Sequence, residues 1–521
     1  MAELTTILRK TREYKQAPMQ TRREFLATAT AAAANIARGA AQPRPNILVI
    51  ITDQQSAGML SCAGNRYLQT PNMDSLAQKG VRFDRAYVTN PVCSPSRMSL
   101  MTGRMPSAIG MECNEDNASG RKIVPAGMLR DSLGRTFRDA GYQTAYAGKV
   151  HLPPAEHAKG GDQLEAYGFE LLSRDQRGEM AASCAAFLGE KHERPFLMVA
   201  SFINPHDICF MAISAFDKAT GQRSPEVGKK QARAGSPAEY LARALRTPGG
   251  VPEEEFYRRH CPTLPANHEV PKDELSSLMV DKRDFQRWVR QKWGERDWRM
   301  HRWAYARLTE QVDSEIGVVL KALRESGREK DTLVVLTSDH GDQDSSHRLE
   351  HKEVLYEEAI RVPFILSGPG VTRAGAVDRE HLVSNGLDLI PTLCDFAGIA
   401  KPRSLHGRSV RPLAQAKDAQ WRDCVLVENH LARLVHGGRW KYMVGREEMH
   451  GGDCGICPGR IKQWDGRVRE MLVDLQADPG EMSNLASERR EQRRLQTGRR
   501  LLHEWCSQND VALDSRYIVS A

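Results

Sequence analysis

Four short apolar runs restrict the folds that this chain can adopt. They read NILVIIT, PFLMVAS, TLVVLT and PFILS and lie at residues 46–52, 195–201, 332–337 and 363–367. Continuous apolar runs of this length are typical of strands that are buried on both faces of a parallel sheet. Helical patterns are found between them, at residues 72–79, 128–140 and 307–326. Strands that alternate with helices predict an α/β domain in which helices cover both faces of a large, mostly parallel sheet.

The pattern changes after about residue 412, and the rest of the chain predicts a smaller unit. Short strands separated by glycine and polar turns, typical of an antiparallel sheet, are expected at residues 425–428, 432–436, 439–444 and 471–474. A charged helix is expected at residues 487–507. A chain of 521 residues exceeds the size at which one hydrophobic core stops growing. We therefore expect an α/β domain over residues 46–412 and a C-terminal α+β subdomain over residues 413–521.

The first 45 residues differ from the rest of the chain in charge. They hold eight Lys and Arg residues and three Glu residues, so residues 1–45 carry +5 of the formal net charge of +8. The remaining chain is nearly balanced, so no nucleic-acid partner is expected. Arg22 and Arg23 precede a weakly apolar, alanine-rich run at residues 27–37. Twin arginines ahead of such a run are typical of a twin-arginine export signal followed by a short linker.

This signal predicts where the protein resides. Export by the twin-arginine export machinery would place it in the periplasm or outside the cell. The alanine-rich run is too short to span a bilayer, so no stable membrane anchor is expected. The alternative interpretation is a frayed basic tail that contains a chance Arg-Arg pair.

The cysteines predict no disulfide scaffold, because eleven is too few for this length and odd in number. Cys454 and Cys457 form one suggestive pair, but no matching Cys or His pair lies nearby, so a zinc site is not favoured. A short disulfide and two free thiols remain the alternatives, and neither is given a catalytic role.

Two aspartates follow predicted strands. Asp53 directly follows the run at residues 46–52, and Asp339 closely follows the run at residues 332–337. Ligands of such sheets bind beyond the carboxyl ends of the strands. We therefore expect both carboxylates at the same edge of the sheet.

One motif carries the strongest functional signal. Residues 93–97 read Cys-Ser-Pro-Ser-Arg, which resembles the sequence that a formylglycine-generating enzyme recognises in sulfatases. Other family-like motifs appear in the expected order, NILVIITDQ at 46–54, GKVH at 148–151, NPH at 204–206, SDHG at 338–341, Lys352 and LQADPGEMSNL at 475–485. From about residue 46 to the C-terminus, the chain resembles the type I sulfatases of the alkaline phosphatase superfamily.

The resemblance implies a nucleophile at position 93. Cys93 would be oxidised to formylglycine, and the hydrated aldehyde would attack the sulfur atom of a sulfate ester. Asp339 would accept the proton of the attacking hydroxyl, and Arg97 would hold the diol. Pro95 suits the first turn of a helix whose N-terminal amides would face the sulfate.

The resemblance also implies roles for other basic residues. Lys149 and Lys352 would contact sulfate oxygens as compact cations. His151 would deprotonate the remaining hydroxyl and so expel sulfate, and His206 would protonate the departing alcohol. His347 corresponds to a family position near the substrate.

A Ca²⁺ site is implied as well, because hard oxygen ligands favour this ion. Its expected ligands are Asp53, Gln54, Cys93 in its oxidised form, Asp339 and His340. Gln54 departs from the commonest pattern, which has a second Asp. An amide oxygen can still coordinate, but one negative charge is lost. His340 stands where other members have Asn or His, and an imidazole can ligate.

These observations predict an exported, Ca²⁺-dependent sulfatase that acts on a sulfated small molecule or saccharide. The closest alternative is a phosphonate monoester or phosphodiester hydrolase that uses the same site, since Gln at position 54 also occurs in such relatives. A non-catalytic carbohydrate-binding relative is a third interpretation. The intact set of Cys93, Arg97, Lys149, His151, His206 and Lys352 argues against it.

The segment between His206 and Tyr305 lacks strong periodicity and ends in an Arg/Trp-rich stretch. Four of the eight tryptophans lie within sixteen residues there, namely Trp288, Trp293, Trp298 and Trp303. A five-residue spacing does not keep side chains on one helix face. Two interpretations stay open: a wall that stacks on a sugar and pairs with its anionic groups, or packing of this segment against the core.

Overall fold

The computed structural model describes residues 44–114, 123–156, 163–222, 235–280, 283–446, 468–509, 511 and 517–519. The chain from Pro45 onward forms one compact unit. The predicted export signal and the pair Cys454 and Cys457 lie outside the described residues. The domain boundary near residue 412 stays a prediction. Among the described helices, none combines the length and the apolar character that crossing a membrane requires.

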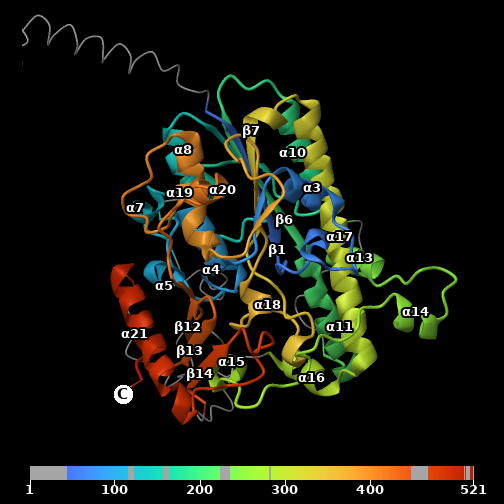
Figure 1. Cartoon of the computed structure of the whole chain (residues 1–521). Helices are drawn as coiled ribbons and strands as arrows, with labels where there is room; N and C mark the ends of the chain where they lie inside the picture. Colours follow the sequence, from blue (N-terminus) through green and yellow to red (C-terminus); the bar gives the residue numbers. More distant parts are fainter. Residues whose placement is uncertain are drawn as a thin grey trace, which may run out of the picture. The chain divides into compact units, whose positions relative to one another are not determined.

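The described residues form an eight-stranded sheet with the strand order β5-β4-β6-β1-β7-β8-β2-β9 (Figure 1). Its strands are β1 (Asn46–Asp53), β2 (Val81–Phe83), β4 (Gln143–Gly148), β5 (Glu170–Ser173), β6 (Phe196–Pro205), β7 (Thr332–Ser338), β8 (Phe364–Ser367) and β9 (Ala376–Asp378). A separate pair consists of β3 (Ala86–Tyr87) and β10 (Val383–Ser384).

The mostly parallel sheet confirms the predicted fold class. β1 lies between β6 and β7 and runs parallel to both, with Ile47 opposite Leu197 on one side and Leu333 on the other. β8 runs antiparallel to both of its neighbours, β7 and β2. The predicted runs correspond to β1, β6, β7 and β8, whereas β4 and β5 lack long apolar runs and were not among them.

The two faces of β1 pack into two different cores. Ile47, Val49 and Ile51 contribute to one core, and Leu48 and Ile50 contribute to the other. Successive side chains of a strand point to opposite faces, so a continuous apolar strand supplies both cores. Figure 1 shows one layer of helices on each side of the sheet.

The helices divide between these faces. The first core includes side chains of α4 (Cys93–Thr102), α8 (Leu133–Asp139) and α19 (Asn385–Ala397). The second includes side chains of α3 (Pro71–Lys79), α10 (Gly178–Gly189) and α17 (Glu295–Glu325). Several further described helices are only four residues long, namely α5 (Pro106–Ile109), α7 (Ala126–Leu129), α9 (Gln163–Ala166), α18 (Glu357–Ile360) and α20 (Arg411–Ala414).

Two predicted helices differ from the observed ones. The helix expected at residues 128–140 is divided into α7 and α8, because Ser132 adopts an extended conformation before α8 and its hydroxyl donates to the carbonyl oxygen of Tyr167. The helix expected at residues 307–326 begins at Glu295, so the Arg/Trp-rich stretch supplies its first turns.

The segment before α17 contains several short helices joined by irregular stretches. Among its described residues, the helices are α11 (Cys209–Thr220), α13 (Pro237–Ala244), α14 (Glu253–Arg259), α15 (Ser276–Val280) and α16 (Asp284–Lys292). Trp293 and Trp298 pack with α11 and α16 in one cluster, while Trp303 packs against Phe256 of α14. Trp293, Trp298 and Trp303 are 8%, 1% and 6% exposed. The packing interpretation is therefore confirmed for these three tryptophans.

The C-terminal strands form the predicted four-stranded antiparallel sheet. In order they are β11 (Val425–Glu428), β12 (Ala432–Gly437), β13 (Trp440–Gly445) and β14 (Glu470–Asp474). The terminal helix α21 (Gln492–Gln508) packs Leu495, Leu502 and Trp505 on this sheet. This C-terminal sheet and its helix confirm the α+β character that the sequence predicted.

We expect Trp298→Ala to lower the free energy of unfolding by about 3–5 kcal/mol, because it removes a fully buried indole and leaves a cavity. Trp288→Ala is the matched control, since Trp288 lies on α16 and is only partly buried. Urea unfolding followed by circular dichroism measures both. Equal effects of the two substitutions would contradict the packing role of Trp298.

Candidate active site

Two carboxylates meet at the carboxyl edge of the large sheet. Asp53 is the last residue of β1, and Asp339 directly follows β7. The residues just before them, Thr52 and Ser338, lie opposite each other in the two paired strands. Both aspartates are fully buried. The backbone N–H of Gln54 donates to Oδ1 of Asp339 over 3.1 Å, which joins the two strand ends. The predicted placement of both carboxylates at one edge is confirmed.

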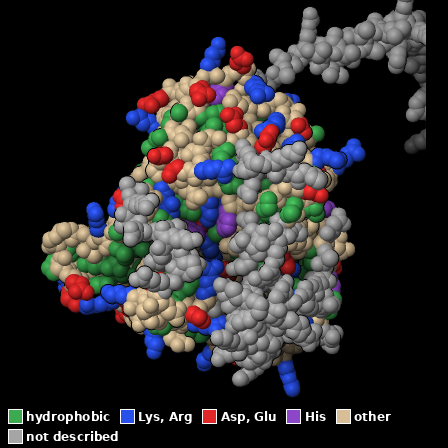
Figure 2. All heavy atoms as spheres, turned by 180° about the vertical axis from the view of Figure 1, so that it is seen from behind, with side chains coloured by type: hydrophobic (Ala, Val, Ile, Leu, Met, Phe, Trp, Pro, Cys, Tyr) green, Lys and Arg blue, Asp and Glu red, His purple; other side chains and the backbone are tan. Residues whose placement is uncertain are grey.

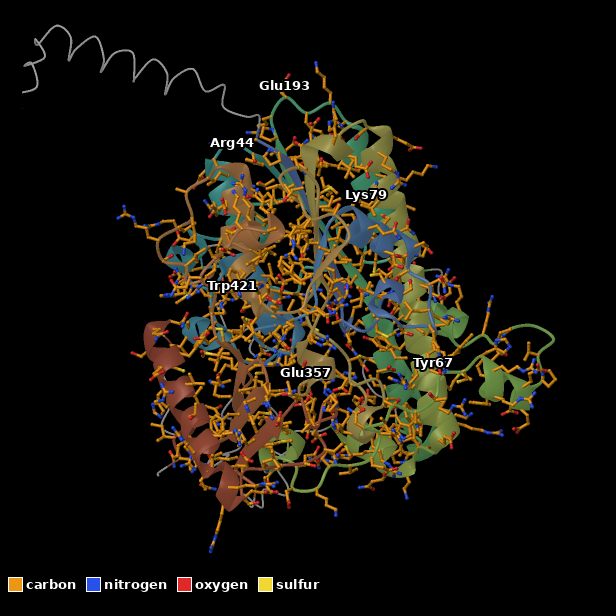
Figure 3. All side chains as sticks on the ribbon, in the orientation of Figure 1. Arg44, Tyr67, Lys79, Glu193, Glu357 and Trp421 are labelled. Carbon is orange, nitrogen blue, oxygen red and sulfur yellow. The ribbon has the colours of Figure 1, made fainter. Side chains whose placement is uncertain are left out.

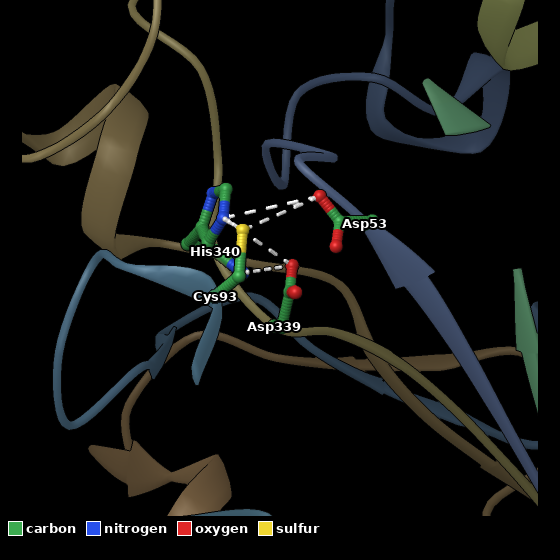
Figure 4. Close-up of side chains that lie close together, drawn as sticks. All are labelled: Asp53, Cys93, Asp339 and His340. Atoms are coloured by element: carbon green, nitrogen blue, oxygen red, sulfur yellow. Dashed lines mark hydrogen bonds and ion pairs between the residues drawn. The ribbon is translucent and has the colours of Figure 1, made fainter. Parts of the chain in front are cut away.

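Cys93 lies between these carboxylates and His340 (Figure 4). It is the first residue of α4, and its Sγ atom is 3.1 Å from Nε2 of His340 and 3.8 Å from Oδ1 of Asp53. One ligand atom from each of Asp53, Cys93, Asp339 and His340 lies within 4.8 Å of the others. These four residues, predicted as metal ligands from distant parts of the sequence, form one buried cluster.

Arg97 connects both carboxylates one turn after Cys93. Its Nη2 and Nε atoms bind Asp53 and Asp339 over 2.9 and 2.8 Å. Its Nη1 donates to the Lys149 carbonyl oxygen and to the Ser201 hydroxyl over 2.9 and 2.7 Å. The guanidinium therefore lies against the two carboxylates. These contacts do not test its predicted role in holding the diol, which stays a prediction.

The surroundings shift the pKa values of Asp53 and Asp339 in opposite directions. Burial and Cys93 would raise the pKa of Asp53, but Lys149, His206 and Arg97 together hold it well below its usual value. The ammonium of Lys149 binds Asp53 directly. Burial and the nearby Asp53 charge raise the pKa of Asp339 to about 7. The shift follows from burial and from the closeness of two carboxylates, of which one is paired with Lys149.

Lys352 contacts both Cys93 and Gln54. Its ammonium donates to Oε1 of Gln54 over 2.7 Å and to the Cys93 sulfur over 3.1 Å. The amide of Gln54 also donates to Asp342 over 2.6 Å, and its Oε1 accepts from Cys209 over 3.2 Å. The Gln54 side chain is thus held beside the cluster by three neighbours. Its role as a metal ligand stays a prediction.

The pocket stabilises negative charge at the position of the Cys93 sulfur. Burial opposes ionisation, but Lys149, Lys352 and His340 lower the pKa of the Cys93 thiol well below its usual value. Burial and the two lysines depress the pKa of His206 to about 3, and burial also lowers the pKa of His151. Within the described residues, the buried Nδ1 atoms of both histidines have no hydrogen-bond partner.

His347 lies apart from this cluster. Its Nε2 is 2.8 Å from the Gly480 carbonyl oxygen, its Nδ1 is 3.4 Å from Gln343 Oε1, and its ring stacks on Tyr356 with centroids 4.0 Å apart. The side chain is fully buried. The structure therefore does not bring His347 together with Cys93, and its predicted contact with substrate remains untested.

Sequence reasoning missed residues that hold the site in place. Ser201 in β6 accepts from Arg97 and donates to the Lys149 carbonyl oxygen, and Asp342 accepts from Gln54. The hydroxyl of Ser96 donates to the Asp339 carbonyl oxygen over 2.5 Å. Ser201 is the last residue of the apolar run predicted as a strand at residues 195–201. That position could have indicated that Ser201 lies near Asp53.

Figure 2 shows a depression in which histidine and basic side chains gather. A buried cysteine at a helix start lies among lysines, histidines and a carboxylate pair that could hold a metal ion, and this combination suits an anionic substrate. Such a site on an α/β sheet is typical of hydrolases that use a bound metal ion.

Comparisons with known proteins agree with this class. The family model described as Sulfatase matches residues 45–399, and the model described as N-sulphoglucosamine sulphohydrolase, C-terminal, matches residues 345–506. The chain therefore belongs to the sulfatase family of the alkaline phosphatase superfamily, and it is a sulfuric ester hydrolase.

Similar proteins include two enzymes of Bacteroides thetaiotaomicron. A Delta 4,5-hexuronate-2-O-sulfatase is 28% identical over 90% of this chain and 90% of its own length. An N-acetylglucosamine-6-O-sulfatase is 24% identical over 85% of this chain and 82% of its own length. A solved structure of a 2-O GAG sulfatase superposes with a TM-score of 0.70 at 25% identity, covering 90% of this chain and 93% of that chain.

Removing the guanidinium that joins the carboxylates should destabilise the protein. We expect Arg97→Ala to lower the free energy of unfolding by about 3–5 kcal/mol, because two buried carboxylates lose their common partner. Arg82→Ala is the control, since Arg82 is also buried but pairs over 2.5 Å with Asp84, whose side chain is 28% exposed. Chemical denaturation compares them, and an equal loss would contradict the central role of Arg97.

Proposed function

We propose that this protein hydrolyses sulfate esters of a sulfated saccharide, with Cys93 oxidised to formylglycine as the nucleophile. The observation that carries the proposal is the position of Cys93. It opens α4 within the sequence CSPSR, and it is buried between the Asp53–Asp339 carboxylate pair and Lys352. Hydrolysis would consume one water and release the saccharide hydroxyl and hydrogensulfate.

The thiol sulfur of Cys93 stands in for an oxygen on the aldehyde carbon of formylglycine. In its hydrated form this group would supply the hydroxyl that attacks sulfur. Lys352, 3.1 Å from this position, and Lys149, bound to Asp53, would neutralise the charge of the sulfate oxygens. Fixed cations in a buried site stabilise developing negative charge more strongly than water does.

We propose that Ca²⁺ is the cation. Asp53, Asp339 and His340 would hold it, together with position 93 and the amide oxygen of Gln54. Carboxylate and amide oxygens suit this hard ion, which would add positive charge beside the sulfate. The buried cluster of Asp53, Cys93, Asp339 and His340, whose ligand atoms all lie within 4.8 Å of one another, supports a cation there.

Two histidines are proposed to move protons. His206 follows β6, and His151 lies beyond the end of β4, so both lie at the carboxyl edge of the sheet. Their buried Nδ1 atoms lack partners among the described residues. We assign deprotonation at position 93 to His151 and protonation of the departing alcohol to His206. The role of His206 requires that the negative charge of the bound ester offset Lys149 and Lys352 and raise the pKa of His206 from about 3.

The relatives support a glycosaminoglycan-derived substrate. One relative is named a Delta 4,5-hexuronate-2-O-sulfatase, and one solved structure is that of a 2-O GAG sulfatase. We therefore propose a 2-O-sulfated uronate at the end of a glycosaminoglycan fragment as the substrate class. We also propose oxidation by a formylglycine-generating enzyme and export through the twin-arginine pathway to the periplasm or the medium. One similar protein is named an extracellular sulfatase.

The first test addresses nucleophile and substrate together. Protein made with a formylglycine-generating enzyme should carry an aldehyde at position 93, seen as a mass change of the tryptic peptide. It should release sulfate from unsaturated hexuronate-2-O-sulfate disaccharides, and Cys93→Ala should lose activity by at least about a thousandfold. Cys184→Ala, at a buried cysteine in the second core, is the control and should retain it. Hydrolysis of phosphonate esters in preference to every sulfate ester tested would overturn the proposal.

The second test addresses the metal. Ca²⁺ at a hundredfold excess over its Kd should stabilise the chelated protein by about 2.7 kcal/mol. Asp339→Asn should abolish that stabilisation, because one anionic ligand is removed. Thermal unfolding with and without Ca²⁺ measures the effect independently of turnover, and activity should return with the same Ca²⁺ dependence. Full activity of a demonstrably metal-free preparation would refute the assignment.

A further inference from the structure

The backbone on both sides of Lys352 is strained. His351 and Glu353 have φ values of 80° and 77°, which lie in the left-handed region that residues with a side chain rarely adopt. Each such residue costs roughly 1–3 kcal/mol and persists only where the surroundings hold it. The contacts of this loop therefore determine where the Lys352 ammonium lies relative to Cys93.

The C-terminal sheet supplies two of those contacts. Nδ2 of Asn429, between β11 and β12, donates to the carbonyl oxygen of Glu353 over 2.9 Å. Nζ of Lys441, in β13, donates to the carbonyl oxygen of Leu355 over 3.0 Å. Both donors bind backbone within three residues of Lys352, and both side chains are fully buried.

The two donors are themselves fixed. Oδ1 of Asn429 accepts from the backbone N–H groups of Leu431 and Ala432, each over 2.8 Å, which holds the turn between β11 and β12. Lys441 also binds Glu481 over 2.6 Å and Glu357 over 3.3 Å. Glu357 opens α18 between the large sheet and the C-terminal sheet (Figure 3).

The same sheet also reaches the segment that carries Cys93. The N–H of Glu428, at the end of β11, donates to the carbonyl oxygen of Thr89 over 2.8 Å. The N–H of Glu353 donates to the carbonyl oxygen of Pro91 over 3.2 Å, so the Lys352 loop and the Cys93 segment are joined directly. The C-terminal sheet thus contacts both segments whose separation sets the distance from Lys352 to Cys93.

We infer that Asn429 and Lys441 are positioning residues for Lys352, so that the C-terminal sheet sets the geometry of the sulfate-binding cation. This inference rests on the proposed function of Lys352. Neither donor touches the reacting atoms, and each acts through the loop backbone. A purely structural role would reduce stability without a specific effect on Lys352.

A double-mutant cycle distinguishes these roles. We expect Asn429→Ala to lower kcat/KM for the 2-O-sulfated disaccharide by about tenfold to a hundredfold, because a shift of about 1 Å in a catalytic group costs up to about a hundredfold. In a Lys352→Ala background the same substitution should change kcat/KM by no more than about twofold, because its effect passes through the missing lysine.

Asn484→Ala is the matched control. Asn484 also bridges backbone groups of the C-terminal sheet, accepting from Leu472 N–H over 3.1 Å and donating to the Glu470 carbonyl oxygen over 2.9 Å. We expect it to lower the thermal midpoint while leaving kcat/KM unchanged. If Asn429→Ala does not fold, Asn429→Asp replaces it, since Oδ1 is kept and the Nδ2 donor is lost, with Asn484→Asp as its control.

The outcomes separate the inference from the function on which it rests. Losses that multiply in the double variant, or an equal loss in the Asn484 control, overturn the positioning role alone. A Lys352→Ala enzyme as active as the unsubstituted protein overturns both the positioning role and the proposed role of Lys352. A non-additive cycle with an unaffected control supports both.

Discussion

The guanidinium of Arg97 is the interaction on which the site depends. It contacts Asp53 at the end of β1, Asp339 beyond β7 and Ser201 within β6, so one side chain ties together three neighbouring strands. Burial opposes its charge, yet the two carboxylates raise the pKa of Arg97 above its usual value. Buried carboxylates without such a partner would carry a large desolvation cost. Because Arg97 lies one turn after Cys93, the same contacts fix the start of α4.

The fold was predictable where local pattern and tertiary burial coincide. The apolar runs that became β1, β6 and β7 are buried on both faces, so composition alone identifies them. β4 reads QTAYAG and is a strand because it pairs in parallel with β6, a non-local contact that has no short-range signal. The prediction of one continuous helix at residues 128–140 was wrong at Ser132. The hydroxyl of Ser132 donates a hydrogen bond to the Tyr167 carbonyl oxygen, and the helix is interrupted there.

The site was predictable as a set of residue types but not as a set of contacts. The motifs identify the buried cluster around Cys93, because each supplies a ligand at a strand end or helix start. The positions of the motifs did not predict that the Gln54 side chain forms hydrogen bonds with Asp342 and Lys352. Nor did they predict that His347 packs on Tyr356. Those contacts depend on left-handed residues in the loop after β7, including His347 with φ 56°, and residue type does not specify such conformations.

The contacts that build the site also link turnover to the stability of the whole chain. Arg97 and Asp339 are 242 residues apart, and Asn429 and Glu353 are 76 residues apart, so the site exists only when distant segments have folded together. A substitution that loosens the C-terminal sheet can therefore act in two ways. It can lower the folded fraction, which reduces all activity in proportion, or it can shift Lys352 in molecules that remain folded. Because the strained loop is held by that sheet, we expect the second effect to appear before global unfolding.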